Sequence, residues 1–331
     1  MYILSTVNLT VFIRSNIVEV MRPWKYQTVG LIFIIGVILI LLFSIYGRTF
    51  DTRSVGVDDL SSKTGHELIT QQNVHQIQQK IYATSGLPEE YQIPSDEELD
   101  KLDEPTLMKI YWKYINMLQI LCKDVIRVGN LNDGGKEICV DNGFKPQAPC
   151  LVYSFGINNM FDFDNSIVNT FGCDVHCFDP SMKNETRRLS EHVWFYKWGL
   201  GGRNHVNNKN WEIKTLDTIR KELGHTNRSI DILKIDIEGD EWNAIPQMIV
   251  SRALNDVKQI SMETHFASEF AHTHNYWGGL PPNKQLSALR QLYDFGFRTF
   301  MRERNLWGKQ KWPGLSVEIT NVNEVSMIKP V

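Results

Sequence analysis

Short apolar runs alternate with helix-like segments along the second half of the chain. The runs are rich in β-branched and aromatic residues and end in glycine or in polar clusters, which is typical of buried strands. The predicted strands are residues 151–156, 175–179, 193–196, 230–237 and 260–264, and the predicted helices are residues 162–171, 216–223 and 285–294. This alternation predicts βαβ units in a mostly parallel, Rossmann-like α/β sheet.

Two late apolar runs, residues 297–301 and 315–319, follow the last of these helices. No helix is predicted between them, and strands joined without a long crossover pair in antiparallel fashion. We therefore expect an antiparallel hairpin at one edge of the sheet.

A long uncharged stretch lies near the N-terminus. Residues 26–47 carry no charged side chain and, as a helix, are long enough to cross a bilayer core of about 30 Å. A cleaved signal peptide would have a shorter apolar region with a small-residue exit, so an uncleaved transmembrane anchor is favoured. Arginine and lysine are balanced on its two sides, so the positive-inside rule does not choose an orientation.

The predicted anchor organises the rest of the chain. Residues 1–25 form a tail, expected to be cytoplasmic, residues 48–94 a polar stalk, and residues 95–331 a globular domain. A capping box at Ser95 and Glu98 opens this domain. Apolar residues at helical spacing follow Pro105, and they predict a helix that continues to Cys122; the stripe is Met108, Tyr111, Ile115, Leu118 and Cys122.

Composition narrows the class of partner and the compartment. The formal net charge is -3 in 331 residues, so there is no basic excess and a nucleic-acid partner is disfavoured. Five cysteines allow two disulfides and one free thiol in an oxidising lumen, and their pairing stays open. Asn184 and Asn227 stand in glycosylation sequons. We expect a single-pass type II protein of the endoplasmic reticulum or Golgi with a lumenal domain, or a protein secreted after cleavage.

The densest group of candidate chemical residues closes the strand predicted at residues 230–237. Asp236 and Glu238 lie at its carboxyl end, where ligands bind in open α/β sheets. Carboxylates so close together repel one another unless a ligand, a cation or helix amides offset them. A functional role is favoured over a solvated strand end.

The first two predicted strands suggest a nucleoside site. Gly156 ends the first strand in a turn whose amides can approach a ligand, and Asp179 follows about 20 residues later, where an acidic side chain can bind ribose hydroxyls. The turn holds a single glycine, so it is a weak dinucleotide fingerprint and fits a smaller nucleoside cofactor better.

Three separated motifs resemble one family. Residues 153–159 (YSFGINN), 178–182 (FDPSM) and 233–239 (LKIDIEG) are similar to the methyltransferase-like protein 24 group, which is related to FkbM-type methyltransferases. Shorter matching segments lie at residues 198–202, 215–219 and 262–265. The resemblance implies a seven-stranded class I methyltransferase sheet that uses S-adenosylmethionine, on the lumenal side of a type II membrane protein.

The resemblance also implies roles for individual residues. Asp179 would bind the ribose hydroxyls, and Asp236 would face the cofactor or the acceptor. The residues that would face the methionine moiety are Ser154, Phe155, Gly156, Asn158 and Asn159.

An oxygen acceptor, such as a glycan hydroxyl, would also have to lose a proton during methyl transfer. The candidates for the base are Glu238, Glu263 and His265, because burial and neighbours can tune carboxylates and imidazole. With Asp236 they form the predicted catalytic group.

Two alternatives to a metal-free methyltransferase are a metal site and a scaffold without catalysis. His265, His272 and His274 have spacings that follow no metal-site signature, so no metal is expected. A methyltransferase-like scaffold that kept the fold without catalysis is the alternative to an enzyme. The oligomeric state and the acceptor are not predicted.

Overall fold

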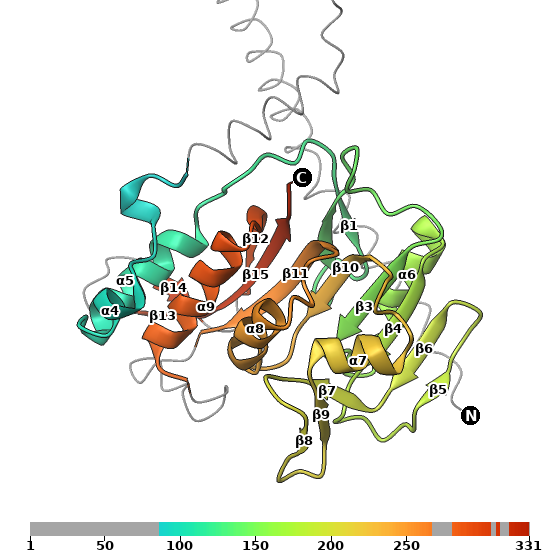
Figure 1. The fold of residues 1–331 in the computed structure, drawn as a ribbon. Coiled ribbons are helices and arrows are strands. Elements are labelled where there is room, and N and C mark those ends of the chain that lie inside the picture. Colours follow the sequence, from blue (N-terminus) through green and yellow to red (C-terminus); the bar gives the residue numbers. More distant parts are fainter. Residues whose placement is uncertain (1–85, 267–279, 306–308, 312–317, 331) are drawn as a thin grey trace, which may run out of the picture. The chain divides into compact units, whose positions relative to one another are not determined.

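The computed structural model describes residues 86–266, 280–305, 309–311 and 318–330 (Figure 1). Its helices in these ranges are η1 (Glu89–Tyr91), α4 (Asp96–Leu99), α5 (Glu104–Ile115), α6 (Asp162–Phe171), α7 (Leu216–Glu222), α8 (Glu241–Val250) and α9 (Pro282–Asp294). The strands of the main sheet are β3 (Leu151–Phe155), β4 (Asp174–Phe178), β5 (Arg187–Arg188), β6 (Val193–Tyr196), β10 (Ile230–Ile235), β11 (Val257–His265), β12 (Arg298–Arg304) and β15 (Val322–Ile328). The strands of the smaller sheets are β1 (Val125–Val128), β2 (Lys136–Cys139), β7 (Trp198–Leu200), β8 (His205–Val206), β9 (Glu212–Lys214), β13 (Lys309–Lys311) and β14 (Glu318–Thr320).

An eight-stranded sheet in the order β12-β15-β11-β10-β3-β4-β6-β5 organises the domain. The strands from β11 to β6 pair in parallel, whereas β15 is antiparallel to both β11 and β12. Without the short edge strand β5, seven strands remain, and numbered along the chain they stand in the order 3-2-1-4-5-7-6. The predicted α/β sheet, mostly parallel with an antiparallel edge, is confirmed.

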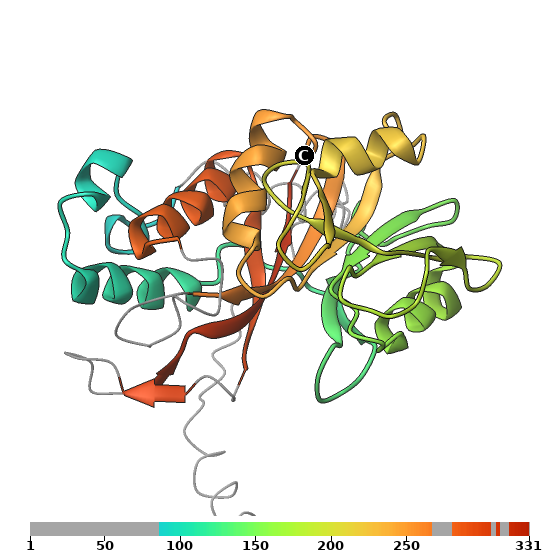
Figure 2. The same ribbon diagram turned by 90° about the horizontal axis from the view of Figure 1, so that it is seen from below.

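Helices cover both faces of the sheet (Figure 2). Helices α7, α8 and α9 lie over one face, and α6 lies over the other. On the first face Trp242 and Ile245 of α8 pack in a core with Leu289 of α9. On the second face Phe163 and Ile167 of α6 pack against the apolar side chains of β3, β4 and β6. Because β10 is covered on both faces, all six of its residues are buried, including Asp231 and Lys234, whose charged groups have hydrogen-bond partners.

The late strand pairing differs from the prediction. Strand β12 pairs with Val322–Ile328 (β15), whereas residues 318–319 belong to β14, which pairs with β13. Residues 315–317 lie outside the described residues. The sequence of β15 is not recognised as a strand because it contains polar residues, but in the structure these residues form hydrogen bonds. Asn323 Nδ2 donates to Tyr111 Oη at 2.8 Å, and Ser326 Oγ lies 3.2 Å from Ser261 Oγ.

The helix predicted to reach Cys122 ends earlier, at Ile115. Leu118 is 52% exposed, so it does not continue the buried stripe. Cys122 is joined by a disulfide to Cys139 of β2, so the chain after Ile115 leads to β2 and does not continue the helix. The capping box at Ser95 is confirmed, because its hydroxyl accepts the Glu98 N–H and its own N–H donates to the Glu98 carboxylate.

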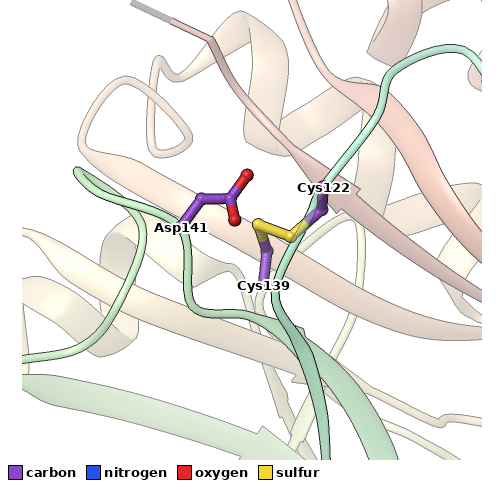
Figure 3. Close-up of side chains that lie close together, drawn as sticks. All are labelled: Cys122, Cys139 and Asp141. Atoms are coloured by element: carbon purple, nitrogen blue, oxygen red, sulfur yellow. A yellow bond between two sulfur atoms is a disulfide. The ribbon is translucent and has the colours of Figure 1, made fainter. Parts of the chain in front are cut away.

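Two disulfides and one thiol account for the five cysteines. Cys122 and Cys139 are joined beside Asp141 (Figure 3), whose carboxylate accepts the N–H groups of Lys123 and Asp124. A second bridge joins Cys150, just before β3, to Cys173, just before β4. Cys177 is a buried free thiol. The first bridge ties the segment after α5 to β2, and the second ties together the residues that precede β3 and β4.

The predicted anchor, residues 26–47, lies outside the described residues. Within the described ranges, no helix combines the length and the hydropathy that a membrane span requires. Leu87 and Ile93, in the segment predicted as stalk, are buried in the main core.

The Cys150–Cys173 bridge closes a loop with a sequence separation of 23 residues. Replacing both cysteines by alanine should therefore lower the free energy of unfolding by about 3 kcal/mol, because the unfolded chain regains its freedom. Urea denaturation of the full chain measures this loss. Cys177→Ala is the matched control, since it removes a buried sulfur without a cross-link. Equal losses in the two variants would contradict the pairing.

Candidate active site

The site lies where the strand order reverses. Strands β3 and β10 are parallel neighbours, and the helices that follow them, α6 and α8, lie on opposite faces of the sheet (Figure 2). The connections therefore diverge and leave a crevice beyond the carboxyl ends of these strands. A cavity of about 520 Å³ opens there. Its lining includes most of the residues predicted from the sequence, namely Phe155, Gly156, Asn158, Asp179, Asp236, Glu238, Glu263 and His265.

The turn after β3 requires glycine. Gly156 has a φ of +74°, and a Cβ at this position would lie 1.6 Å from the carbonyl oxygen of Asp236. The Gly156 N–H donates to the carbonyl of Phe178 at 2.9 Å, and the ammonium of Lys234 donates to the Gly156 carbonyl at 3.2 Å. The turn is therefore held against both neighbouring strands, with its backbone at the cavity wall.

Asp179, at the end of β4, forms hydrogen bonds with the turn after β3 and with the loop after β4. Its Oδ2 accepts the Asn158 N–H at 2.8 Å, and its Oδ1 accepts the N–H and the hydroxyl of Ser181 at 2.8 and 2.6 Å. The side chain is buried but lines the cavity. Each carboxylate oxygen has two lone pairs, so Oδ2 keeps capacity to accept a hydrogen bond from a ligand hydroxyl.

Two predicted cofactor residues lie outside the lining. Ser154 is fully buried within β3, one residue before the lining residue Phe155, and neighbouring side chains on a strand point to opposite faces. Asn159 is exposed beyond the turn. Contact of either residue with the cofactor stays a prediction.

A second group of residues gathers around His265 at the end of β11. Its Nδ1 lies 3.3 Å from Glu241 Oε1, and its Nε2 lies 3.4 Å from Glu263 Oε2 and 3.5 Å from Glu238 Oε2. Glu241 is fully buried at the start of α8, where it accepts the N–H groups of His265 at 2.6 Å and Gly239 at 2.8 Å. The imidazole is thus surrounded by carboxylates from the loop after β10, from the start of α8 and from β11.

This environment sets the protonation of the predicted catalytic groups. Burial alone would lower the pKa of His265, but the carboxylates of Glu241 and Glu263 raise it well above its usual value. Burial raises the pKa of Asp236, with a further rise from the Glu263 charge, against the opposing effect of Lys234. The raised pKa favours the protonated form of His265, and the protonated imidazole cannot act as a general base.

Glu238 differs from its neighbours in exposure. Its side chain is 75% exposed and lines the cavity, and its backbone has a φ of +55°, which is uncommon outside glycine. Among the three predicted bases it is the one whose carboxylate is open to the cavity and to solvent.

Some residues of the site escaped sequence reasoning. Glu241 is not among the residues predicted from the sequence, although the carboxylates of Asp236, Glu238 and Asp240 precede it closely. Asn305 donates to Glu263 Oε1 at 2.7 Å, and no local pattern marks it. Lys209 and Trp211 lie in the connection between β8 and β9 and line the cavity, and the Lys209 ammonium is 4.5 Å from the centre of the Trp211 indole. His272, His274 and the aromatic residues Tyr276, Trp277 and Trp307 lie outside the described residues.

Comparison with known proteins agrees with this architecture. Residues 74–313, more than half of the chain, match a family described as "Methyltransferase domain". The chain belongs to this methyltransferase family. The sheet order and the cavity at its switch point fit the class I methyltransferase fold that the sequence motifs predicted.

Two curated relatives of this methyltransferase-family chain carry the same name. The chain is 28% identical over 220 residues to "Probable methyltransferase-like protein 24" from Homo sapiens, and the aligned region covers 59% of this chain and 57% of the relative. It is 27% identical over 171 residues to the protein of that name from Rattus norvegicus, which covers 47% and 46%. The chain thus spans about half the length of the curated relatives it matches. The predicted resemblance to the methyltransferase-like protein 24 group is confirmed.

The contact between Gly156 and Asp236 can be tested in this methyltransferase domain by a pair of substitutions. Gly224→Ala places a side chain at a φ of +72° in open space, so it should cost about 1–2 kcal/mol of folding free energy. Gly156→Ala adds a steric overlap with the Asp236 carbonyl and should cost about 1–3 kcal/mol more. Urea unfolding of both variants measures the difference, and equal costs would mean that the turn is not held against β10.

Proposed function

We propose that the chain is an S-adenosylmethionine-dependent methyltransferase with an oxygen acceptor. The observation that carries the proposal is the convergence of the Gly156 turn, Asp179 and Asp236 on one cavity at the switch point of the sheet. The residues fit the cofactor, because the backbone of the Gly156 turn lines the cavity and Asp179 can accept hydrogen bonds from hydroxyls.

Each element of the cavity then has a task. When bound, S-adenosylmethionine supplies a methyl group whose transfer breaks an S–CH₃ bond, forms an O–CH₃ bond and leaves a neutral thioether. Asp179 would hold ribose hydroxyls, and Lys234 keeps the turn at Gly156 in place through the carbonyl it binds. Alignment of the two reactants in the cavity would supply much of the rate of an in-line displacement.

The acceptor hydroxyl must also release a proton. Because the carboxylates of Glu241 and Glu263 favour the protonated form of His265, we assign the base role to Glu238. Its carboxylate is exposed at the cavity wall and can pass the proton on to solvent.

A glycan or another acceptor of the secretory pathway fits this chemistry. Trp211 is half-buried in the cavity wall and offers a flat apolar face for a sugar ring. Two disulfides are typical of an oxidising compartment. With the span predicted at residues 26–47, they support a type II membrane protein whose catalytic domain faces the lumen.

Cofactor binding tests the proposal directly. Titration calorimetry of the full chain should detect S-adenosylmethionine binding, and Asp179→Asn should weaken it at least about 10-fold, because the loss of one charge-assisted hydrogen bond costs about 1.5–3 kcal/mol. Asp217→Asn, on α7 and away from the cavity, is the control. Absence of binding by a chain with a cooperative thermal transition would favour the catalytically inactive scaffold instead.

Glycosylation tests the orientation. Asn227 is exposed in the turn before β10, and its sequon would be modified only if the domain is lumenal. We expect Asn227→Gln to remove one enzymatically cleavable glycan from the full chain expressed in secretory cells. Asn165→Gln, exposed but outside a sequon, should change nothing. Loss of a glycan on substitution of Asn8, whose sequon precedes the predicted span, would show the opposite orientation.

A further inference from the structure

We infer that Asp236, Glu263 and His265 bind a divalent metal ion on the wall of the cavity. Asp236 follows β10, and Glu263 and His265 stand two residues apart at the end of the neighbouring strand β11. Residues two apart on a strand share a face, so the two β11 side chains can meet the carboxylate that follows β10. All three line the cavity.

The distances suit coordination. One ligand atom from each residue can be chosen so that all three lie within 4.8 Å of one another, and His265 Nε2 is 3.4 Å from Glu263 Oε2. Two ligand atoms that each lie about 2.1 Å from one ion are about 3.0–3.4 Å from each other when the angle between them at the ion is between a right angle and the tetrahedral angle. The side chains therefore already stand close to the spacing that a shared ion requires.

The outer atoms of two ligands are held in the way that metal ligands usually are. The Nδ1 of His265 faces the buried Glu241 carboxylate at 3.3 Å, which leaves Nε2 directed toward the cavity. The Oε1 of Glu263 accepts the Asn305 amide at 2.7 Å, which leaves Oε2 on the side of His265. A carboxylate behind a ligating histidine and a donor behind a ligating carboxylate fix ligand orientation.

The negative charge of the surrounding carboxylates favours binding of a cation near His265. The imidazole of His265 is in contact with three carboxylates, those of Glu238, Glu241 and Glu263. Nearby lysines are engaged elsewhere, since Lys136 forms a buried ion pair with Glu324 and Lys234 donates to backbone carbonyls. A divalent metal ion bound at His265 Nε2 would bring two positive charges to these carboxylates.

The donor set indicates the kind of ion. Two carboxylates suit Mg²⁺, Ca²⁺ and Mn²⁺, and an imidazole favours transition metals, so Mn²⁺ satisfies both preferences. The remaining positions would face the cavity. There the ion could bind the acceptor hydroxyl and lower its pKa, which would help the Glu238 carboxylate to take the proton. This role rests on the proposed function, whereas binding of the ion does not.

Binding of Mn²⁺ to the full chain tests the inference. After treatment with a chelator and dialysis, the chain should remove free Mn²⁺ from solution, seen as loss of its aqueous electron paramagnetic resonance signal, with about one ion per chain. Glu263→Gln and Asp236→Asn should each weaken binding at least about 10-fold, and Asn305→Ala should do so by about 10-fold through loss of orientation. Thermal unfolding checks that each variant is folded.

Two control variants separate this inference from the proposed function. Glu185→Gln, whose side chain is 83% exposed, should leave Mn²⁺ affinity unchanged. Asp179→Asn should keep Mn²⁺ binding and lose S-adenosylmethionine binding. Mn²⁺ binding that is lost only in the ligand variants supports the site, even if the cofactor does not bind. A folded chain that binds the cofactor but no Mn²⁺, or Mn²⁺ binding equal in every variant, overturns the site.

Discussion

The contact of Gly156 with the backbone of Asp236 is the constraint on which the site depends. Strands β3 and β10 pair in register up to Phe155 and Ile235, so the next residues of both strands meet at the cavity wall. The approach leaves no room for a side chain on the turn. One missing Cβ thereby places the Gly156 turn and the first carboxylate of the predicted catalytic group side by side.

The carboxylates around His265 impose the second constraint. Burying charges is costly unless each is paired and hydrogen bonded. The structure meets this requirement with Glu241, which binds two backbone N–H groups as well as the imidazole, and with Asn305, which binds Glu263. The arrangement orients the reactive atoms toward the cavity, and it explains how a dense group of acids can persist at the end of two buried strands.

Several elements could be predicted because their signals are local. Helix α6 has the predicted bounds, since an amphipathic run is closed by Gly172, and the strands before and after it are short apolar runs. Strand β15 could not be predicted in this way. Its polar residues Asn323, Glu324 and Ser326 are typical of a loop, and only partners distant in sequence, such as Tyr111 and Ser261, make their burial favourable.

The sequence by itself determined the α/β class, the family and the strand ends that carry Gly156, Asp179 and Asp236, because hydrophobic periodicity and turn glycines act over a few residues. Only the tertiary structure decided which chemical groups meet. The base role predicted for His265 depends on Glu241, and the proposed metal site combines two strands that are separated by helix α8 along the chain. Side-chain distances, burial and charge arise from pairing between distant segments, and no local pattern contains them.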